Sequence, residues 1–291
     1  HIGIDSEQKK EMLSCLGLSS IEQLISETIP KNIRLNKELN LEKELSENEF
    51  LTHIEKLSKK NKNYKSYIGL GYNQSITPSV IKRNILENPS WYTAYTPYQA
   101  EIAQGRMEAL LNYQTIICDL TGMELSNASL LDESTSAAEA MTMLFSARSR
   151  DQKKENIRKF FVSDDTLAQT ISLIQTRAEP LEIDVVVGKL NEFDFSRDFY
   201  GCLMQYPGVH GNINDLKKYG EKAKSNGLKI VVAADILSLC LLKEPSIFGA
   251  DVVVGTSQRF GIPLGYGGPH AAFFATKEEY KRSIPGRIIG V

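Results

Sequence analysis

The chain has 291 residues, of which 42% are apolar and 24% are charged, and its formal net charge at pH 7 is −2. The length fits one large α/β domain with an appended segment, or two modest domains. A charge so close to zero gives no electrostatic reason to expect a nucleic acid or an anionic membrane surface as partner. The longest apolar runs, such as 230–234, are far too short to span a bilayer. We therefore expect an ordinary globular protein with neither kind of partner.

The cysteines are widely spaced and form no Cys-x-x-Cys pair and no Cys/His cluster with the spacing of zinc ligands. They are Cys15, Cys118, Cys202 and Cys240. We therefore expect free thiols in a reducing compartment and no metal site.

Residues 1–62 are expected to form a helical N-terminal segment. Apolar residues recur at helical spacing from Met12 to Ile25, and Pro30 ends the pattern. Residues 36–62 carry many Glu and Lys side chains around scattered apolar residues, which predicts a solvent-facing amphipathic region.

The next part of the chain combines loop with one long helix. Residues 67–100 are rich in aromatic side chains and interrupted by glycine and proline, which predicts loop with short helical pieces. Apolar residues then share one side from Glu101 to Thr121, which predicts a helix, and Gly122 is placed to end it.

After residue 150, strand-like and helical patterns alternate. The strand-like runs are Phe160–Val162, Ile183–Val187, Cys202–Gln205, Lys229–Ala234, Asp251–Val254 and Ala271–Ala275. The clearest helix runs from about Ile213 to Ser225, where Asn212 can cap it and Gly227 can close it. Strands this apolar are expected to be buried on both faces. The alternation predicts a mostly parallel sheet between helices, with residues 63–291 forming one large α/β domain.

Two segments carry polar side chains where a ligand could bind. The small hydroxyl residues Ser134, Thr135 and Ser136 open a helix, and a helix start suits a phosphate group, although plain N-capping is the alternative. Asp235 follows a buried strand, at the edge where doubly wound sheets bind ligands. Its carboxylate could pair with a protonated ring nitrogen, or it could cap a helix over 236–242.

A glycine-rich region at 255–270 joins the last two predicted strands. Glycines allow positive φ and close approach to a ligand, but no G-x-G-x-x-G opens a helix here, so they predict only a tight turn. Among the histidines, His53 is expected on the surface and His270 is expected to be structural. His210 lies in a turn after a strand, where an active-site role is open. No catalytic triad can be assembled from the spacing.

Residues 91–101 hold more aromatic side chains than filling a core requires. They include Trp91, Tyr92, Tyr95 and Tyr98. A tyrosine combines an apolar face with a polar tip, which suits recognition. A binding surface and a subunit interface are both open explanations for this stretch.

Several long strings of residues point to one family. They are Asn84–Pro89 running into Trp91–Glu101, then Asp119–Met123, Asn127–Glu133, Gln258–Gly261, Gly265–His270 and Pro285–Gly290. Together they closely resemble the glycine-cleavage P-protein. The resemblance covers essentially the whole chain and is weakest at 36–62 and 151–200. Strings of this length are far more specific than a short motif.

This resemblance implies a pyridoxal-phosphate-dependent transferase fold of the aminotransferase-like kind (fold type I), here as a large α/β domain preceded by the helical segment. The family decarboxylates glycine with pyridoxal phosphate and passes the aminomethyl group to the lipoyl arm of the H-protein. Its two halves, fused or separate, resemble each other. The resemblance therefore implies a glycine dehydrogenase of glycine catabolism, with glycine, lipoylated H-protein and a second P-protein half as partners in a homo- or hetero-oligomer.

The resemblance also indicates which half this is. A pyridoxal enzyme binds its cofactor through an imine to a lysine, which in the family's active half precedes a glycine-rich turn. Alignment on that turn puts Gln258 at the lysine position, and an amide cannot form the imine. Arg259 stays cationic, and Lys277 lies beyond the next strand. We therefore expect the N-terminal half, inactive alone, with the cofactor bound covalently by the C-terminal half.

With this assignment, residues 134–136 and Asp235 become remnants of a cofactor site. The aromatic stretch is instead expected to shape the active site of the partner half, by orienting groups and excluding water. The residues concerned are Tyr92, Thr93, Tyr95 and Tyr98.

Two rival hypotheses remain open. Another pyridoxal enzyme of the same fold, such as a decarboxylase or a threonine aldolase, would need a lysine before the glycine turn, and Gln258 stands against it. Alternatively, the chain is a non-catalytic scaffold or regulatory subunit that holds an active partner. Addition of pyridoxal phosphate, followed at the imine absorbance band, would separate these hypotheses.

The ends of the chain suggest a piece of a longer protein, because it starts at His1 without Met and stops on an apolar run, 288–291. A small domain that normally follows is expected to be absent or incomplete. Apolar surface near 288–291 should then be exposed, and the isolated piece should be poorly soluble. We expect a cytoplasmic location in a bacterium, or the mitochondrial matrix in a eukaryote.

Overall fold

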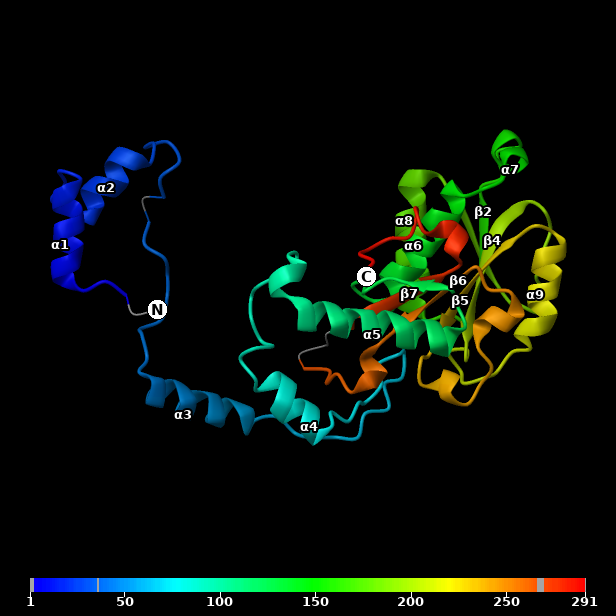
Figure 1. Cartoon of the computed structure of the whole chain (residues 1–291), viewed down its shortest axis with the longest axis horizontal. Coiled ribbons are helices and arrows are strands. Elements are labelled where there is room, and N and C mark those ends of the chain that lie inside the picture. The colour runs from blue at the N-terminus through cyan, green and yellow to red at the C-terminus, as the bar shows by residue number, and fades with distance from the viewer. Residues whose placement is uncertain (1–2, 36, 266–269, 291) are drawn as a thin grey trace. The chain divides into compact units, whose positions relative to one another are not determined.

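The computed structural model describes residues 3–35, 37–265 and 270–290, and the chain divides into two compact units, His1–Lys65 and Ser66–Val291 (Figure 1). Residues 266–269, most of the expected glycine turn, lie outside the described residues.

The helices of the first unit each begin at a side-chain cap. They are α1 (Ser6–Cys15), α2 (Ile21–Thr28) and α3 (Glu47–Ser58). Asp5, Ser20 and Ser46 accept hydrogen bonds from the backbone N–H groups that each first turn leaves free. The expectation of helix across the whole segment is wrong for 37–46, which is irregular. Its leucines are exposed, so no packed apolar face stabilises a helix there.

The second unit is built on a seven-stranded sheet of order β1-β7-β6-β5-β4-β2-β3. The strands are β1 (Leu125–Ser126), β2 (Lys159–Ser163), β3 (Asp184–Gly188), β4 (Phe199–Tyr206), β5 (Lys229–Ala234), β6 (Val252–Thr256) and β7 (Ala272–Thr276). Strands β2 to β6 pair in parallel, and β7 runs antiparallel to both β6 and β1. The six expected strands and the mostly parallel sheet are confirmed. Strand β1 was missed because two residues carry no detectable pattern.

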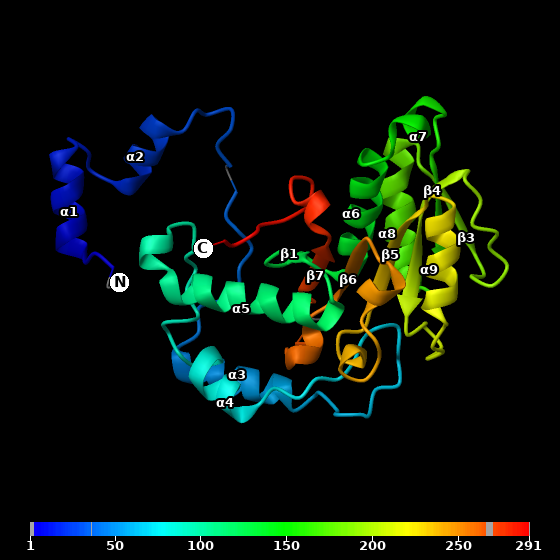
Figure 2. The same ribbon diagram turned by 45° about the vertical axis from the view of Figure 1, so that its right-hand side comes forward.

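The sheet has a core on each face because successive side chains of a strand point to opposite sides. On β5, Ile230, Val232 and Ala234 join the core that packs against α5 (Gln104–Thr121) and α9 (Leu216–Ser225). The alternate residues Val231 and Ala233 join the core that packs against α6 (Glu133–Ser146) and α8 (Ala168–Ala178). Figures 1 and 2 show α6 and α8 together on one side of the sheet and α9 on the other.

Strand β3 departs from the expectation that every strand is buried on both faces. It is an edge strand, and Val186 and Val187 are 36% and 38% exposed. An edge strand has one neighbour only, and the helices that cover the centre of the sheet do not enclose it.

The segment that precedes the sheet is irregular, as expected from its glycines and prolines. It contains α4 (Ser79–Ile81), which continues into the π-helical turn Lys82–Leu86, and a 3-10 turn at Ala100–Ile102. Helix α5 then starts three residues later than the predicted Glu101 and ends at Gly122, which has φ of 71°. A Cβ at Gly122 would lie 2.1 Å from Oγ of Ser246, so both the backbone conformation and the packing require glycine.

Helix α9 begins later than predicted. Its N-cap is Asp215, whose carboxylate accepts a hydrogen bond from the backbone of Lys218, whereas Asn212 donates its side-chain amide to Asp165. The predicted cap was wrong because Asn212 is engaged by a residue far away in sequence. Gly227, at φ of 78°, follows the helix as expected.

The expected exposure of the apolar end is wrong for Ile289. That side chain is only 8% exposed, and its backbone N–H and C=O groups both bond to the side-chain amide of Gln114 on α5. Helix α5 thus supplies a binding partner for this segment that the local sequence could not indicate.

Two further expectations concern chemistry and membrane contact. The four cysteines are free thiols, as expected. No helix in the described part of the chain combines the length and apolar character that a membrane span requires.

Candidate functional site

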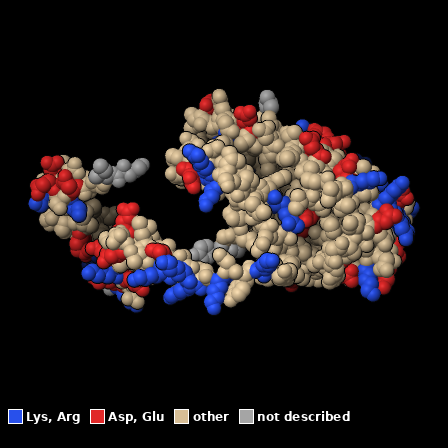
Figure 3. Space-filling model, turned by 90° about the horizontal axis from the view of Figure 1, so that it is seen from below, with Lys and Arg blue, Asp and Glu red and all other residues tan. Residues whose placement is uncertain are grey.

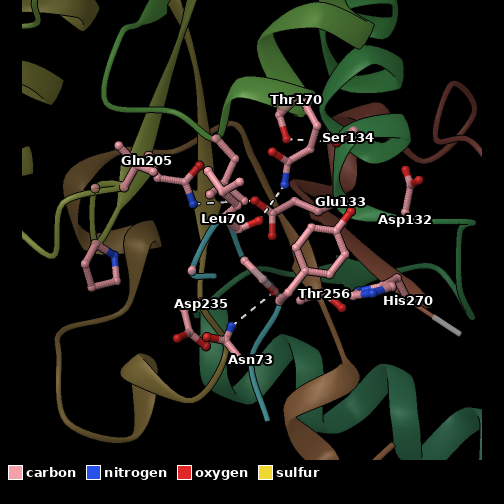
Figure 4. A pocket seen from close by; sticks show the side chains of 18 of the residues that line it. Leu70, Asn73, Asp132, Glu133, Ser134, Thr170, Gln205, Asp235, Thr256 and His270 are labelled. Carbon is pink, nitrogen blue, oxygen red and sulfur yellow. Dashed lines mark hydrogen bonds between the residues drawn. The ribbon is translucent and has the colours of Figure 1, made fainter. Parts of the chain in front are cut away.

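A cavity of about 510 Å³ opens at the carboxyl ends of β4, β5 and β6, beside the start of α6 (Figure 4). This is the edge where ligands bind in sheets of this kind. Glu133 lies near the middle of the labelled side chains, with Gln205 from β4 reaching toward it. The irregular segment 69–73 forms another part of the wall.

The start of α6 is capped by Asp132, not by one of the three hydroxyl residues. Asp132 Oδ1 accepts a hydrogen bond of 2.7 Å from the backbone N–H of Thr135. The expected hydroxyl cap is wrong because an aspartate one position before the helix has the right extended backbone and the stronger acceptor. The carboxylate of Asp132 also interacts favourably with the positive end of the helix dipole. A phosphate bound at this helix start would have made the same interaction.

The three hydroxyl residues do different things. Ser134 lines the cavity, and its Oγ lies 2.9 Å from Oγ1 of Thr170 on α8. Thr135 is not part of the cavity wall, and Ser136 is fully buried behind it, where its Oγ has no hydrogen-bond partner among the described residues.

Glu133 carries a carboxyl group in the cavity whose pKa is clearly raised. Its pKa is raised to about 7, first because burial removes solvation from the charged form, and further because the charges of Asp235 and Asp132 are near. Hydrogen bonds from Gln205 and from the Thr256 backbone act in the opposite direction. The Gln205 Nε2 to Glu133 Oε1 distance is 3.4 Å, so this bond is weak. Glu133 is therefore partly protonated near neutral pH.

Asp235 follows β5 into the cavity and forms a bidentate ion pair with Arg259. The Nε–Oδ1 and NH2–Oδ2 distances are 3.2 and 2.7 Å. Asp235 Oδ1 also accepts the backbone N–H of Leu237, but only a 3-10 turn at Ser238–Cys240 follows. The alternative of a helix over 236–242 is therefore wrong, and the carboxylate is already paired with a cation of the same chain.

Gln258 lies behind the cavity wall and is fully buried. Its Nε2 donates to the backbone carbonyl of Asn73 at 3.0 Å and, at a longer 3.4 Å, to that of Ile262. Ser75 Oγ donates to the Gln258 carbonyl, and Thr77 Oγ1 donates to the carbonyl of Gly261. Together these bonds fasten residues 73–77 to the turn that follows β6.

His270 lines the cavity, whereas His53 and His210 do not. Its ring packs edge-on against Tyr72, with centroids 5.4 Å apart, and its Nε2 is buried without a partner among the described residues. His210 is exposed and is not part of the wall, and His53 is exposed on α3, as expected. No group of His, Cys, Asp and Glu suited to a metal ion occurs within 3–35, 37–265 and 270–290.

The aromatic stretch lies on the surface, apart from the cavity wall. Tyr92, Tyr95 and Tyr98 are 61%, 40% and 75% exposed, and Thr93 is also exposed. Arg106 at the start of α5 orders the stretch, because its guanidinium donates to the backbone carbonyls of Ser90, Trp91 and Tyr95. The structure therefore brings Ser134 and Asp235 together but leaves the four aromatic-stretch residues elsewhere.

Sequence reasoning missed most of the cavity. Glu133, Gln205 and the 69–73 segment were not predicted to belong to it. The position of Gln205 near the end of a buried strand was a usable signal, because such ends converge at one edge of a parallel sheet. Nothing local indicated that residues 69–73, far earlier in the chain, would close the same edge.

Comparison with known proteins agrees with this fold. The family model described as glycine cleavage system P-protein matches residues 1–291. The glycine dehydrogenases (decarboxylating) of Christiangramia forsetii and Flavobacterium johnsoniae are 64% and 60% identical over the whole of this chain. The chain spans 31% of the length of each of these two relatives.

Among solved structures, a crystal structure of glycine decarboxylase (P-protein) of the glycine cleavage system, in inhibitor-bound form, aligns with a TM-score of 0.87 and 30% identity. The alignment covers 99% of this chain and 65% of that chain. The α/β fold expected from the resemblance, with its mostly parallel sheet, is thereby confirmed. The chain belongs to the glycine cleavage system P-protein family.

Proposed function

We propose that this chain is the N-terminal, lysine-free half of a P-protein, a glycine dehydrogenase that decarboxylates glycine with pyridoxal phosphate and transfers the aminomethyl group to the lipoyl arm of the H-protein. The chain does not hold the cofactor and contributes surface to the active site of the C-terminal half. The relatives compared are bacterial, and we propose that the enzyme is located in the bacterial cytoplasm.

The single observation that carries this proposal is the engagement of Gln258. The residue aligned with the cofactor lysine is a buried amide whose hydrogen atoms are used by backbone carbonyls of the same chain. An amide forms no imine, and this one is not part of the cavity wall.

The cavity also fits pyridoxal phosphate poorly. Asp235, the carboxylate suited to a protonated ring nitrogen, is paired with Arg259. The helix start that would receive a phosphate already carries Asp132 and Glu133. Three carboxyl groups face one guanidinium in the cavity, and a phosphate dianion would be repelled there.

The surface around the aromatic stretch supports the proposal that this chain contacts the C-terminal half. Many large apolar side chains of residues 67–102 are exposed, including Tyr67, Ile76 and Ile102 at 89%, 90% and 71%. Figure 3 shows broad areas of one face with few charged side chains. Exposed apolar area on this scale is typical of a surface that another protein covers. Because the chain is 31% of the length of its relatives, the remaining chain is the proposed occupant.

Imine formation tests the proposal. Pyridoxal phosphate added to this chain alone should give no imine absorbance band, because no lysine is available at the position of Gln258. Addition of the C-terminal half should produce the band together with glycine decarboxylation. An imine on the isolated chain, located by borohydride reduction and peptide mapping, would contradict the proposal.

The tyrosines test the contribution to the partner's active site. Tyr95→Phe and Tyr98→Phe in the complete enzyme should each lower kcat/KM for glycine about tenfold, the effect of losing about 1.4 kcal/mol of a hydrogen bond in the transition state. The pH profile should not change, because these hydroxyls orient groups and transfer no proton. Tyr64→Phe, on an exposed residue outside the stretch, is the matched control.

The second candidate function is that of a scaffold or regulatory subunit, and the absence of a lysine at position 258 equally favours it. The two candidates differ in one outcome. If both tyrosine variants decarboxylate glycine at the wild-type rate, the chain holds its partner without shaping the active site, and the scaffold function is the correct one.

A further inference from the structure

The cavity contains more acceptors and negative charge than the chain itself satisfies. Among the described residues, its wall holds the carboxyl groups of Asp132, Glu133 and Asp235 and the guanidinium of Arg259, which is a formal excess of two negative charges when Glu133 is ionised. Arg259 is already committed to Asp235 in a bidentate pair. The charge that remains uncompensated is therefore at the start of α6.

A second and independent feature points the same way. Gln205 lines the cavity and is only 6% exposed, and its Oε1 has no hydrogen-bond partner among the described residues. Its Nε2 is directed at Glu133, which leaves Oε1 as a free acceptor beside the carboxyl group (Figure 4). A buried acceptor without a donor costs free energy, and a ligand that brings N–H groups removes that cost.

We propose that this cavity binds a small organic ammonium ion, with the charge held by Glu133 and an N–H group donated to Oε1 of Gln205. The ligand is distinct from pyridoxal phosphate, because the same carboxyl groups that attract an ammonium ion repel a phosphate. A volume of about 510 Å³ is within the range of pockets for small molecules. The site goes beyond the proposed function, since it does not require this chain to take part in decarboxylation.

The surroundings of Glu133 predict how binding depends on pH. Two negatively charged carboxylates face Glu133, namely Asp132 at the start of the same helix and Asp235 after β5. Neutral hydrogen-bond donors face it from Gln205 on β4 and from the backbone of Thr256 on β6. Arg259 and His270 also line the cavity. The pKa of about 7 leaves Glu133 mostly protonated at pH 6 and mostly ionised at pH 8. An ammonium ion prefers the ionised form, so its affinity should rise with pH by up to about tenfold over this interval.

The probe is dimethylammonium, which offers two N–H donors and, as a secondary amine, forms no neutral imine with pyridoxal phosphate. Its binding to the complete P-protein is measured by ligand-observed NMR at pH 6 and pH 8 and at constant ionic strength. We expect saturable binding that is about tenfold tighter at pH 8, with no comparable binding of acetate or inorganic phosphate to the same site.

Glu133→Gln should remove the pH dependence and weaken binding at pH 8 at least tenfold, and Gln205→Leu should weaken it at both pH values. Glu139→Gln removes a carboxylate from the same helix outside the cavity and should bind as the wild type does. Melting temperatures of the variants establish that each is folded. No binding to the wild type, or unchanged binding to Glu133→Gln, would overturn the proposal. Neither outcome affects the imine test of the proposed function.

Discussion

Gln258→Glu should lower the thermal stability of the complete protein and release residues 73–77 from the turn after β6. The substitution keeps the shape of the side chain but replaces its N–H donor with a carboxylate oxygen. That oxygen would lie 3.0 Å from the carbonyl of Asn73 in a fully buried position. A buried charge that faces acceptors costs about 3–5 kcal/mol, which corresponds to a fall in melting temperature of about 6–20 °C for a unit of this size.

Calorimetry and hydrogen exchange of the 73–77 amides together check this expectation. Gln175→Glu, on an exposed position of α8, introduces the same chemical change without burial and should leave both measurements unchanged. If Gln258→Glu has the same melting temperature as the wild type, the Gln258 amide does not hold residues 73–77 in place. The observation that supports the proposed loss of the lysine would then need another explanation.

Asp251→Ala should lower the stability of the protein about as much as Gln258→Glu does. The reason is that the buried carboxylate of Asp251 connects the starts of two strands with the end of a third. Asp251 is 3% exposed, and its Oδ2 accepts the backbone N–H of Ile230 at 2.8 Å, where β5 begins. Its Oδ1 pairs with Lys277 after β7 and lies 3.8 Å from Nζ of Lys229. Removal leaves a buried N–H group without an acceptor and two cations without a counterion, at a cost of about 3–5 kcal/mol.

Chemical denaturation of the complete protein, followed by a probe in the second unit, measures this loss. Glu221→Ala, on the exposed face of α9, is the control and should change the midpoint by less than the equivalent of about 0.5 kcal/mol. An equally small change for Asp251→Ala would mean that the two lysines find other partners at no cost.

The sheet was predictable because its signal is local. Runs such as 230–234 are apolar at every position, and only a strand buried on both faces tolerates that pattern in so short a stretch. Helix α5 was predictable for a similar reason, and Gly122 marks its end through a backbone conformation that other residues rarely adopt. The helix caps were less predictable, because Asn212 and Asp215 are both competent and a contact with Asp165 decides between them.

The candidate site was predictable only in outline. Asp235 and Ser134, both named as candidate site residues, line the same cavity, whereas Thr135 and Ser136, named with them, do not. Strand ends meet at one edge of a parallel sheet, which accounts for the position of Asp235. The pairing of Asp235 with Arg259 and the engagement of Gln258 by Asn73 were not predictable. Each joins segments that are far apart in the sequence.

The sequence by itself determined the family, the α/β class and the absence of a lysine at position 258, because these depend on which residues are present and on their local order. Only the tertiary structure decided what the cavity can bind. The charge, burial and hydrogen-bond partners of Glu133, Gln205 and Asp235 arise when β4, β5 and α6 converge. The pKa of a carboxyl group depends on this surrounding protein, whereas its identity does not.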